Sequence, residues 1–350
     1  MKANPLLLCS MGDPAGIGWP ILKEIIENKR VYLKEKEQNL LKYFIVVGDL
    51  LKSDEKWISR YFEVLPISGK KFTVKELSLF LSKRNPRKQK PIFLALGHNS
   101  FELGKPNVHA ALRSYIYFKQ CLYLWQGLPN CALLTLPVSK EWISKTGKNF
   151  TGHTAELSKT YHQNGVMCMH HSKLSIIPLT EHIPIAKVPE AIYQVPYPAI
   201  AKALLQLETL KRKKLKIAML ALNPHAGEGG ALGKEEDFLR EKILFLQKQN
   251  LAIEGPFPAD SFFMNYKDYD VVLAQYHDQG LIPFKMISGF SGVNITLNLP
   301  KMRVSPDHGT AYLQAQKGEY DIKSVLVAMR LAWKWSLAWQ QSFSSPSLSP

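Results

Sequence analysis

The chain has 350 residues, of which 46% are hydrophobic and 21% charged, a composition that describes a folded globular protein and excludes a disordered one. No stretch approaches the roughly 20 apolar residues that span a bilayer, and the apolar run near the N-terminus is too short for a signal peptide. A net charge of +16 raises nucleic acid as a partner, but the basic residues are scattered, and the densest runs, 83–90 and 211–214, lack aromatic residues that would stack on bases. We therefore expect solvated basic surface, which also suits anionic small substrates.

The cysteines are far apart in the sequence and form no CxxC pair. Without a visible secretory context, this pattern favours reduced thiols in the core of a cytoplasmic protein over disulfides. The four residues are Cys9, Cys121, Cys131 and Cys168.

The first predicted strand, residues 6–10, ends in the glycine-rich turn 11–18 (MGDPAGIG), and a helix follows from about 19 to 28. Glycines after a strand suggest phosphate binding, but the GxGxxG and Walker patterns are absent, so a tight turn that packs closely is an equal alternative. The next predicted elements are strands at 43–48 and 91–96, a variable and irregular surface region at 50–90, an amphipathic helix at 107–125 and a buried strand at 131–136.

The motif TGHT, residues 151–154, opens a predicted helix that runs to Tyr161. Backbone amides at a helix start attract anions, and His153 and Thr154 add side-chain donors there; a simple N-cap is the alternative. Further on we expect strands at 173–179, 216–222, 271–274 and 293–299, helices at 197–212, 235–249 and 321–339, a stiff turn at 255–260, and a fraying Ser/Pro-rich end. Strands alternating with helices indicate an α/β fold with a largely parallel sheet.

Three histidines share one context, because His182, His225 and His277 each follow a predicted strand within a few residues. Polar groups just past strand ends are where α/β folds place ligands. A lone histidine there is more often a satisfied polar residue, but three of them favour a shared divalent metal with an open coordination position. No HxxxH pair fixes the geometry locally, so structural histidines remain the alternative.

Other side chains in these segments suit anion binding or proton transfer. The groups that could bind a phosphate or carboxylate are Lys285, Arg303 and His153. The candidates for handling protons are Asp260, Asp278 and Asp307. Asp278 could equally orient His277.

Seven motifs occur in this order across about 300 residues: MGDPAGIG (11–18), TGHT (151–154), LNPHAGEGG (222–230), GPFPAD (255–260), YHDQG (276–280), GVNITLNLP (292–300) and DHGTA (307–311). With these motifs the sequence resembles the 4-hydroxythreonine-4-phosphate dehydrogenase family of pyridoxal phosphate biosynthesis, in which they run in the same order. Four positions depart from the family pattern. Trp19-Pro20 replaces Pro-Glu, Ala155 replaces Glu after TGHT, and Leu136 replaces the Gly of Thr-Gly-Pro.

The resemblance implies which residues bind the metal and which bind the substrate. Its implied metal ligands are His182, His225 and His277, which would bind zinc, magnesium or cobalt. Its implied substrate contacts are His153, Thr154, Lys285, Asn294 and Arg303. The metal site would lie at the interface of a homodimer, so that some ligands come from the second subunit.

The resemblance also implies the fold of isocitrate and isopropylmalate dehydrogenases, two α/β domains around a cleft. That fold binds NAD or NADP without a Rossmann glycine fingerprint. We expect residues 1–135 plus 300–350 to form the first, discontinuous domain, and residues 136–299 to form the second, which carries the histidines.

The implied reaction is the metal-dependent, NAD(P)-linked oxidation of 4-hydroxythreonine 4-phosphate (4-phosphooxy-L-threonine). The resulting β-keto acid would decarboxylate to 3-amino-2-oxopropyl phosphate, with Asp260 as the candidate base. One alternative is a dehydrogenase of a related four-carbon phosphorylated sugar acid, such as threonate or erythronate 4-phosphate. The other is a basic nucleic-acid-binding protein, which has no need for three strand-end histidines. We expect a cytoplasmic homodimer with no nucleic-acid or membrane partner.

Overall fold

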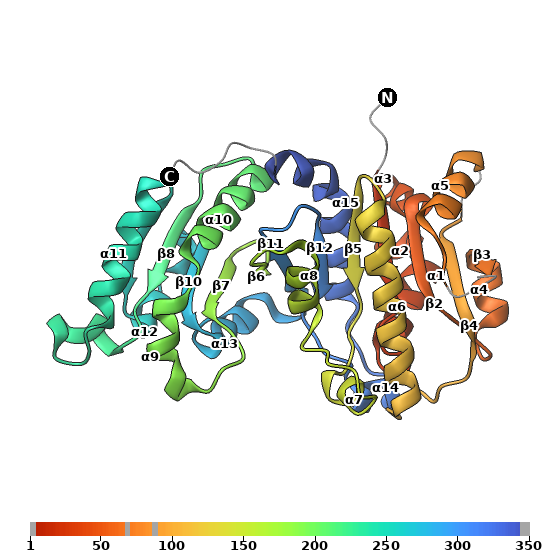
Figure 1. The fold of residues 1–350 in the computed structure, drawn as a ribbon, viewed down its shortest axis with the longest axis horizontal. Helices are drawn as coiled ribbons and strands as arrows, with labels where there is room; N and C mark the ends of the chain where they lie inside the picture. Colours follow the sequence, from red (N-terminus) through yellow and green to blue (C-terminus); the bar gives the residue numbers. More distant parts are fainter. Residues whose placement is uncertain (1–4, 67–70, 86–89, 344–350) are drawn as a thin grey trace. The chain divides into compact units, whose positions relative to one another are not determined.

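The computed structural model describes residues 5–66, 71–85 and 90–343, which form two compact α/β units (Figure 1). Unit 1 comprises Met1–Leu157 and Lys301–Leu337, and unit 2 comprises Ser158–Pro300 and Ala338–Pro350. The predicted α/β fold class is confirmed, whereas the predicted domain boundaries stay a prediction. Part of the basic run 83–90 and most of the Ser/Pro-rich end lie outside the described residues.

Unit 1 contains a parallel sheet with the strand order β3-β4-β2-β1-β5-β12. Its strands are β1 (Leu6–Ser10), β2 (Phe44–Leu51), β3 (Glu63–Pro66), β4 (Ile92–Asn99), β5 (Cys131–Thr135) and β12 (Arg303–Pro306). Because β1 has β2 on one side and β5 on the other, the chain reverses its direction of travel across the sheet at β1. The carboxyl ends of strands at such a switch point are where open α/β sheets place ligands.

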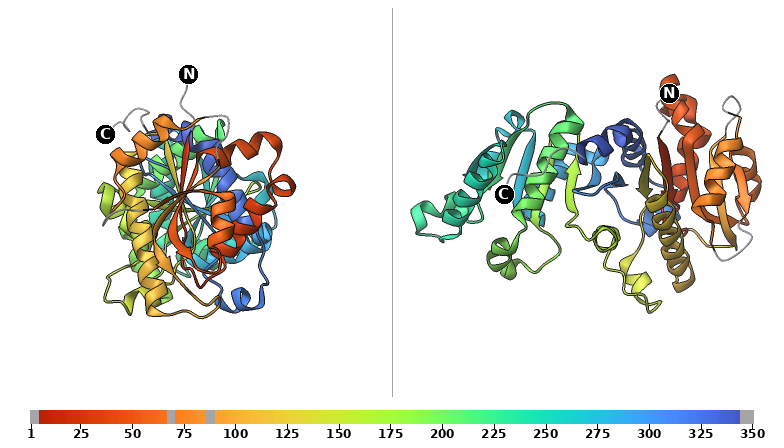
Figure 2. Two further views of the ribbon diagram at one scale, coloured as in Figure 1. Left: turned by 90° about the vertical axis from the view of Figure 1, so that its right-hand side faces the viewer. Right: turned by 45° about the horizontal axis from the view of Figure 1, so that its top comes forward.

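Helices cover both faces of the unit 1 sheet (Figure 2). They are α1 (Gly18–Glu27), α2 (Lys29–Tyr32), α3 (Glu35–Gln38), α4 (Glu55–Tyr61), α5 (Val74–Lys83), α6 (Val108–Gly127), α7 (Lys140–Ser144), the start of α8 (His153–Tyr161), α14 (Tyr312–Lys317) and most of α15 (Lys323–Phe343), with the 3-10 turn η1 (Asn39–Tyr43). The Asn107 side chain accepts a hydrogen bond from the Ala110 amide and so caps α6. Ala111, Phe118 and Leu122 of this predicted amphipathic helix are buried.

The expectation of an irregular region at 50–90 is wrong for the part of it that the structure describes, which contains α4, β3 and α5. Edge strand β3 is largely solvated, so its residues lack the apolar pattern of a buried strand. Helix α5 buries Leu77 alone, and Thr73 and Glu76 form a capping box at its start in which each side chain accepts from the other's backbone amide. That Thr-x-x-Glu signal was available in the sequence.

Trp19, one of the departures from the family pattern, is a core residue of unit 1. It is 2% exposed, and its ring lies edge-on to Trp57 and Phe93 at centroid distances of 5.9 and 5.8 Å. Its indole N–H donates to Asp54 Oδ2 at 2.8 Å. The substitution therefore joins α1 to α4, and the Trp19 side chain contributes packing.

Unit 2 contains a mixed sheet with the strand order β11-β6-β7-β10-β8-β9. Its strands are β6 (Val166–His170), β7 (Ser175–Thr180), β8 (Lys216–Leu220), β9 (Ala252–Phe257), β10 (Val271–Tyr276) and β11 (Val293–Leu297). Strands β7, β10, β8 and β9 are parallel, and β6 is antiparallel to both of its neighbours. A largely parallel sheet was predicted, and β6 is the exception.

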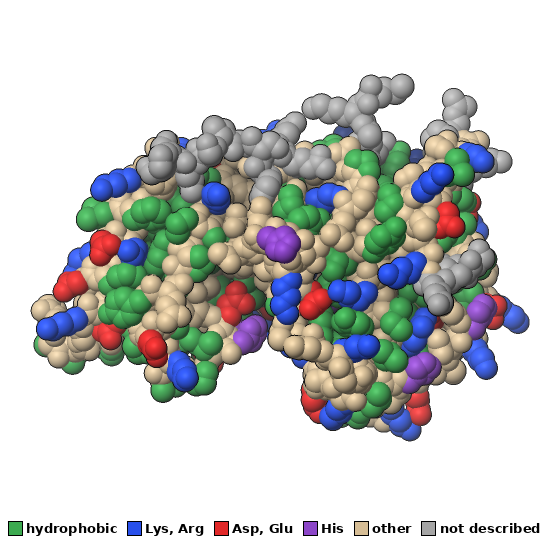
Figure 3. All heavy atoms as spheres, viewed as in Figure 1, with side chains coloured by type: hydrophobic (Ala, Val, Ile, Leu, Met, Phe, Trp, Pro, Cys, Tyr) green, Lys and Arg blue, Asp and Glu red, His purple; other side chains and the backbone are tan. Residues whose placement is uncertain are grey.

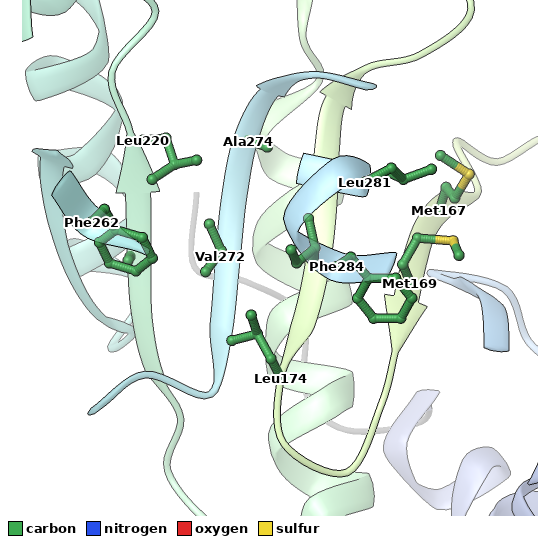
Figure 4. Packing of buried hydrophobic residues seen from close by; sticks show 11 residues of the cluster. Met167, Met169, Leu174, Leu220, Phe262, Val272, Ala274, Leu281 and Phe284 are labelled. Carbon is green, nitrogen blue, oxygen red and sulfur yellow. The ribbon is translucent and has the colours of Figure 1, made fainter. Parts of the chain in front are cut away.

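The helical elements of unit 2 complete its core. They are η2 (Ile185–Lys187), α9 (Val188–Ala191), η3 (Ile192–Gln194), α10 (Tyr197–Lys211), η4 (Pro224–Gly230), α11 (Glu235–Lys248), α12 (Ala259–Phe262), η5 (Tyr266–Asp268), α13 (His277–Ser288) and η6 (Gly289–Ser291). Figure 4 shows Leu281 and Phe284 of α13 packed in one apolar cluster with Met167 and Met169 of β6. This cluster fixes α13 against the sheet.

Unit 2 differs from the sequence prediction in two places. The stiff turn predicted at 255–260 is instead the end of β9, a one-residue link and the start of α12. Pro256 is tolerated there because β9 is an edge strand, where a missing N–H costs no ladder hydrogen bond. Helix α13 was not predicted, because Gly280 and Pro283 lie inside it and both residues normally mark helix ends.

The cysteines, the charged surface and the helix lengths can each be compared with what the sequence predicts. All four cysteines are buried and unpaired, so their predicted place in the core is confirmed. On the face that Figure 3 shows, Lys and Arg side chains lie singly or in small groups with acidic side chains among them. None of the described helices is both long enough and apolar enough to cross a membrane.

Candidate functional site

The three strand-end histidines of unit 2 belong to one edge of its sheet. Strands β7, β10 and β8 are parallel neighbours, and Thr180 at the end of β7 is the register partner of Tyr276 at the end of β10. His182, His277 and His225 follow these three strand ends. Their common location results from the strand order, which inserts β10 between two strands that precede it in sequence.

Two of these histidines are in direct proximity. The ring centroids of His182 and His277 are 5.5 Å apart, and both side chains are partly exposed. His277 Nδ1 lies 2.7 Å from Asp278 Oδ1. Because a carboxylate only accepts, Nδ1 donates this hydrogen bond, and Nε2 is the ring nitrogen that remains for binding a metal. This geometry favours the orienting role for Asp278 that the sequence left open.

The structure does not bring His225 into one group with this pair. Among the described residues, no three His, Cys, Asp or Glu side chains lie close enough together to hold a metal ion. His225 lies in η4, where the backbone is left-handed at His225, Ala226 and Glu228 as well as at the glycines. Left-handed backbone costs about 1–2 kcal/mol for each non-glycine residue, so the surrounding contacts must hold this turn in place.

The other predicted residues of unit 2 lie on three different elements. Lys285 is exposed on α13, eight residues after His277. Asn294 is half-buried on β11, and its Oδ1 has no hydrogen-bond partner among the described residues. Asp260 is exposed in the first turn of α12. It follows the end of β9, so it belongs to the same sheet edge as the three histidines.

A second set of predicted residues meets in unit 1 around Arg303. This side chain is 3% exposed, and its Nε and Nη2 donate to Thr135 Oγ1 at 3.1 and 2.7 Å. Arg303 begins β12 and Thr135 ends the neighbouring β5. Burial lowers the pKa of the Arg303 guanidinium to about 9, which still leaves it charged at neutral pH. The pair thus directs a fixed positive charge toward the carboxyl end of β5.

His153, the first residue of α8, lies beside this charge. Its ring packs edge-on against Phe118 and Phe150, with centroid distances of 4.6 and 5.5 Å. The His153 Nε2 is buried and has no hydrogen-bond partner among the described residues. Burial lowers the pKa of His153 well below its usual value, and the charges of Arg303 and Lys140 lower it further. His153 is therefore neutral at pH 7 in a positive environment.

Lys140 is a member of this cluster that the sequence analysis did not single out. Gly152 has φ +135°, and a Cβ at this position would lie 2.9 Å from Lys140 Cε and 3.1 Å from Nζ. The glycine of TGHT therefore allows the lysine to lie against the start of α8. Lys140, Arg303 and the helix N-terminus give three sources of positive potential, and Thr154 is the second residue of the same helix. The sequence did contain a signal for this lysine, because the dipeptide Ser139-Lys140 follows shortly after the strand predicted at 131–136.

The motifs MGDPAGIG and DHGTA pack against each other in unit 1. Buried Asp13 accepts from the Ala15 amide at 2.9 Å and from the Tyr312 hydroxyl at 2.7 Å, and Ile17 N donates to Thr310 O at 2.9 Å. Burial is the main cause that raises the Asp13 pKa. These contacts support the reading of the glycine-rich turn as closely packed.

Comparison with known proteins gives sequence relatives over nearly the whole chain. Residues 47–332 match the family described as "Pyridoxal phosphate biosynthetic protein PdxA". A 4-hydroxythreonine-4-phosphate dehydrogenase of Sulfurihydrogenibium sp. (strain YO3AOP1) is 33% identical over 336 residues, covering 93% of this chain and 97% of its own. A candidate D-threonate 4-phosphate dehydrogenase of Oceanobacillus iheyensis is 32% identical over 343 residues, covering 95% of this chain and 98% of its own.

Solved structures agree with the sequence relatives. A candidate 4-hydroxythreonine-4-phosphate dehydrogenase from Salmonella typhimurium superposes with a TM-score of 0.74 at 29% identity, covering 95% of this chain and 99% of its own. A terephthalate 1,2-cis-dihydrodioldehydrogenase from Burkholderia xenovorans LB400 shares the fold at a TM-score of 0.57 and 20% identity, covering 95% of this chain and 98% of its own.

Proposed function

The chain belongs to the family of the pyridoxal phosphate biosynthetic protein PdxA, and from this premise we propose that it oxidises 4-hydroxythreonine 4-phosphate with NAD or NADP and one divalent metal ion. Its curated relatives are dehydrogenases, so the chain is an oxidoreductase. Oxidation of the C3 hydroxyl by the nicotinamide would give a β-keto acid. Loss of its carboxylate as CO2 would leave 3-amino-2-oxopropyl phosphate.

The observation that carries this proposal is the His182–His277 pair at the carboxyl edge of the unit 2 sheet. Two partly exposed imidazoles 5.5 Å apart, one with Nδ1 engaged by Asp278, fit a divalent ion that takes nitrogen ligands. His225 would supply the third ligand. An all-imidazole set favours zinc or cobalt over magnesium, which prefers oxygen. A metal bound there would act as a Lewis acid that lowers the pKa of a substrate hydroxyl.

The cationic cluster of unit 1 supports a phosphorylated, anionic substrate. Arg303 is held by Thr135 and is charged, and Lys140 lies at the start of α8. Neutral His153 can donate or accept a hydrogen bond through Nε2, which has no partner among the residues that the structure describes. We assign anion binding to Arg303, Lys140, His153 and Thr154, which would fix the substrate for reaction.

Three further residues receive proposed roles with the substrate. Lys285 and Asn294 would contact it from unit 2, where Asn294 Oδ1, which no described residue contacts by a hydrogen bond, can accept one. Asp260, exposed at the same sheet edge as the histidines, would take the hydroxyl proton directly or through water.

We also propose that the active form is a homodimer whose subunits share the metal site. The His182–His277 pair of one chain would supply two ligands, and His225 of the second copy would supply the third that the family resemblance implies. The cofactor could be either NAD or NADP.

A second candidate substrate is supported by the relative from Oceanobacillus iheyensis, whose name specifies D-threonate 4-phosphate. It matches nearly as much of the chain at nearly the same identity. The two substrates differ at C2, where one carries an ammonium and the other a hydroxyl.

The deciding experiment measures NADH or NADPH formation by the purified protein with each phosphate, with and without a chelator. Chelator-sensitive reduction that prefers 4-hydroxythreonine 4-phosphate supports the first function. Preference for threonate or erythronate 4-phosphate supports the second. Turnover that persists after complete metal removal contradicts the metal assignment in either case.

A further inference from the structure

The turn that carries His225 has an uncommon backbone. Every residue from His225 to Gly230 has a positive φ, with values between 44° and 97°. Consecutive left-handed residues are rare, and non-glycine residues adopt them only where neighbouring groups over-determine the conformation. The position of the His225 imidazole therefore depends on whatever holds this turn.

Asn223 and Glu236 hold the turn at its base. Glu236 Oε1 accepts from the Asn223 backbone N–H at 2.8 Å, and Oε2 accepts from Asn223 Nδ2 at 3.0 Å. Asn223 Nδ2 also donates to Glu235 Oε2 at 2.9 Å. A Cβ on Gly227 would lie 2.6 Å from Glu236 Oε2, so the same carboxylate lies directly against the left-handed turn. Both oxygens of Glu236 are thus engaged by the loop that carries His225.

Glu236 is itself firmly anchored. It is 2% exposed and lies in the first turn of α11, where the helix dipole stabilises a negative charge. Helix α11 packs against β9 and buries Leu239, Ile243 and Leu246. A buried carboxylate is costly unless it is hydrogen-bonded, and the Asn223 donors meet that need. The contacts of Glu236 with Asn223 and Gly227, which we call the clamp, therefore tie the loop to helix α11.

We infer that Glu236 is a positioning residue for the metal centre, because its contacts with Asn223 and Gly227 hold the left-handed turn that presents His225. The inference rests on the proposed function, since it takes His225 as a metal ligand. Glu236 acts through His225 and has no direct bond to the ion.

The test compares Glu236→Ala and Glu236→Gln with His225→Ala and with the control Asp237→Asn. Asp237 is in the same helical turn and pairs with Arg240 at the surface, so the control removes one negative charge and leaves the clamp intact. Co2+ affinity is measured by competition with a chelator, the visible absorption of bound Co2+ reports ligand geometry, and the Tm is taken without metal. Loss of the carboxylate should weaken Co2+ binding about 10–100-fold and shift the absorption bands. Glu236→Gln should lose less Co2+ affinity than Glu236→Ala, because its amide oxygen can still accept a hydrogen bond from Asn223.

The outcomes separate the inference from the function on which it rests. Wild-type Co2+ affinity and spectrum in the folded Glu236 variants, with binding lost in His225→Ala, would overturn the positioning role and leave the proposed function standing. Unchanged Co2+ binding in His225→Ala would overturn the metal assignment itself. If Glu236→Ala does not fold, Glu236→Gln decides. A lower Tm with an unchanged Co2+ spectrum would show a structural role only and would also overturn the inference.

Discussion

Replacing Arg303 with Met should raise the KM for the phosphorylated substrate and leave kcat nearly unchanged. The guanidinium is 3% exposed and held by two hydrogen bonds to Thr135 Oγ1, so its charge is fixed before substrate arrives. A hydrogen bond to a charged group contributes about 1.5–3 kcal/mol. At 1.4 kcal/mol per tenfold change, losing one such bond to the phosphate raises KM by about 10–150-fold. Because ground and transition states both lose this contact, the effect falls on KM.

Steady-state kinetics with inorganic phosphate as a competitive inhibitor would measure this change. The phosphate Ki should rise in proportion to KM, since both report the same anion contact. Met is chosen because its unbranched apolar side chain avoids leaving a buried charge and fills most of the volume. Arg330→Met is the matched control, because Arg330 is a half-buried arginine of unit 1 that pairs with Glu37. If KM and Ki stay at their wild-type values while the Tm is preserved, Arg303 does not bind the anion.

Three further predictions concern the histidines and Gly152. His277→Ala should abolish both turnover and bound metal, as measured by activity and elemental analysis, while circular dichroism stays unchanged. The lowered pKa of His153 predicts that stability declines as the pH falls below about 6.5, because the unfolded chain then binds a proton that the folded chain excludes. In His153→Gln, the free energy of unfolding measured by urea denaturation should depend less on pH across that range. Gly152→Ala should raise KM, because its Cβ would lie 2.9 Å from Lys140 Cε at a φ of +135°.

Each of these predictions has a contradicting result. Metal retained by folded His277→Ala protein would remove His277 from the ligand set. An identical pH profile in His153→Gln would show that another group titrates. A wild-type KM in Gly152→Ala would mean that Lys140 is not needed at the start of α8.

The sequence by itself determined the fold class and the order of most elements. Strands β1 and β5 are short apolar runs that are soon followed by Gly12 and Pro137, and such a run is a local signal for a buried strand. It also placed His182, His225 and His277 just after strands. Elements without a local signal were not predicted. Helix α13 contains Gly280 and Pro283, and its packing over β7 and β10 stabilises it.

The tertiary structure alone decided which of these groups meet. Arg303 and Thr135 are separated by 168 residues and become neighbours because β12 pairs with β5. The His182–His277 contact exists because β10 pairs with β7. The pattern of residues within either strand does not reveal which distant strand will be its hydrogen-bonded neighbour. Glu236 and Asn223 likewise meet only in the folded chain, where the Glu236 carboxylate of α11 accepts from the Asn223 backbone N–H at the base of the left-handed turn that carries His225.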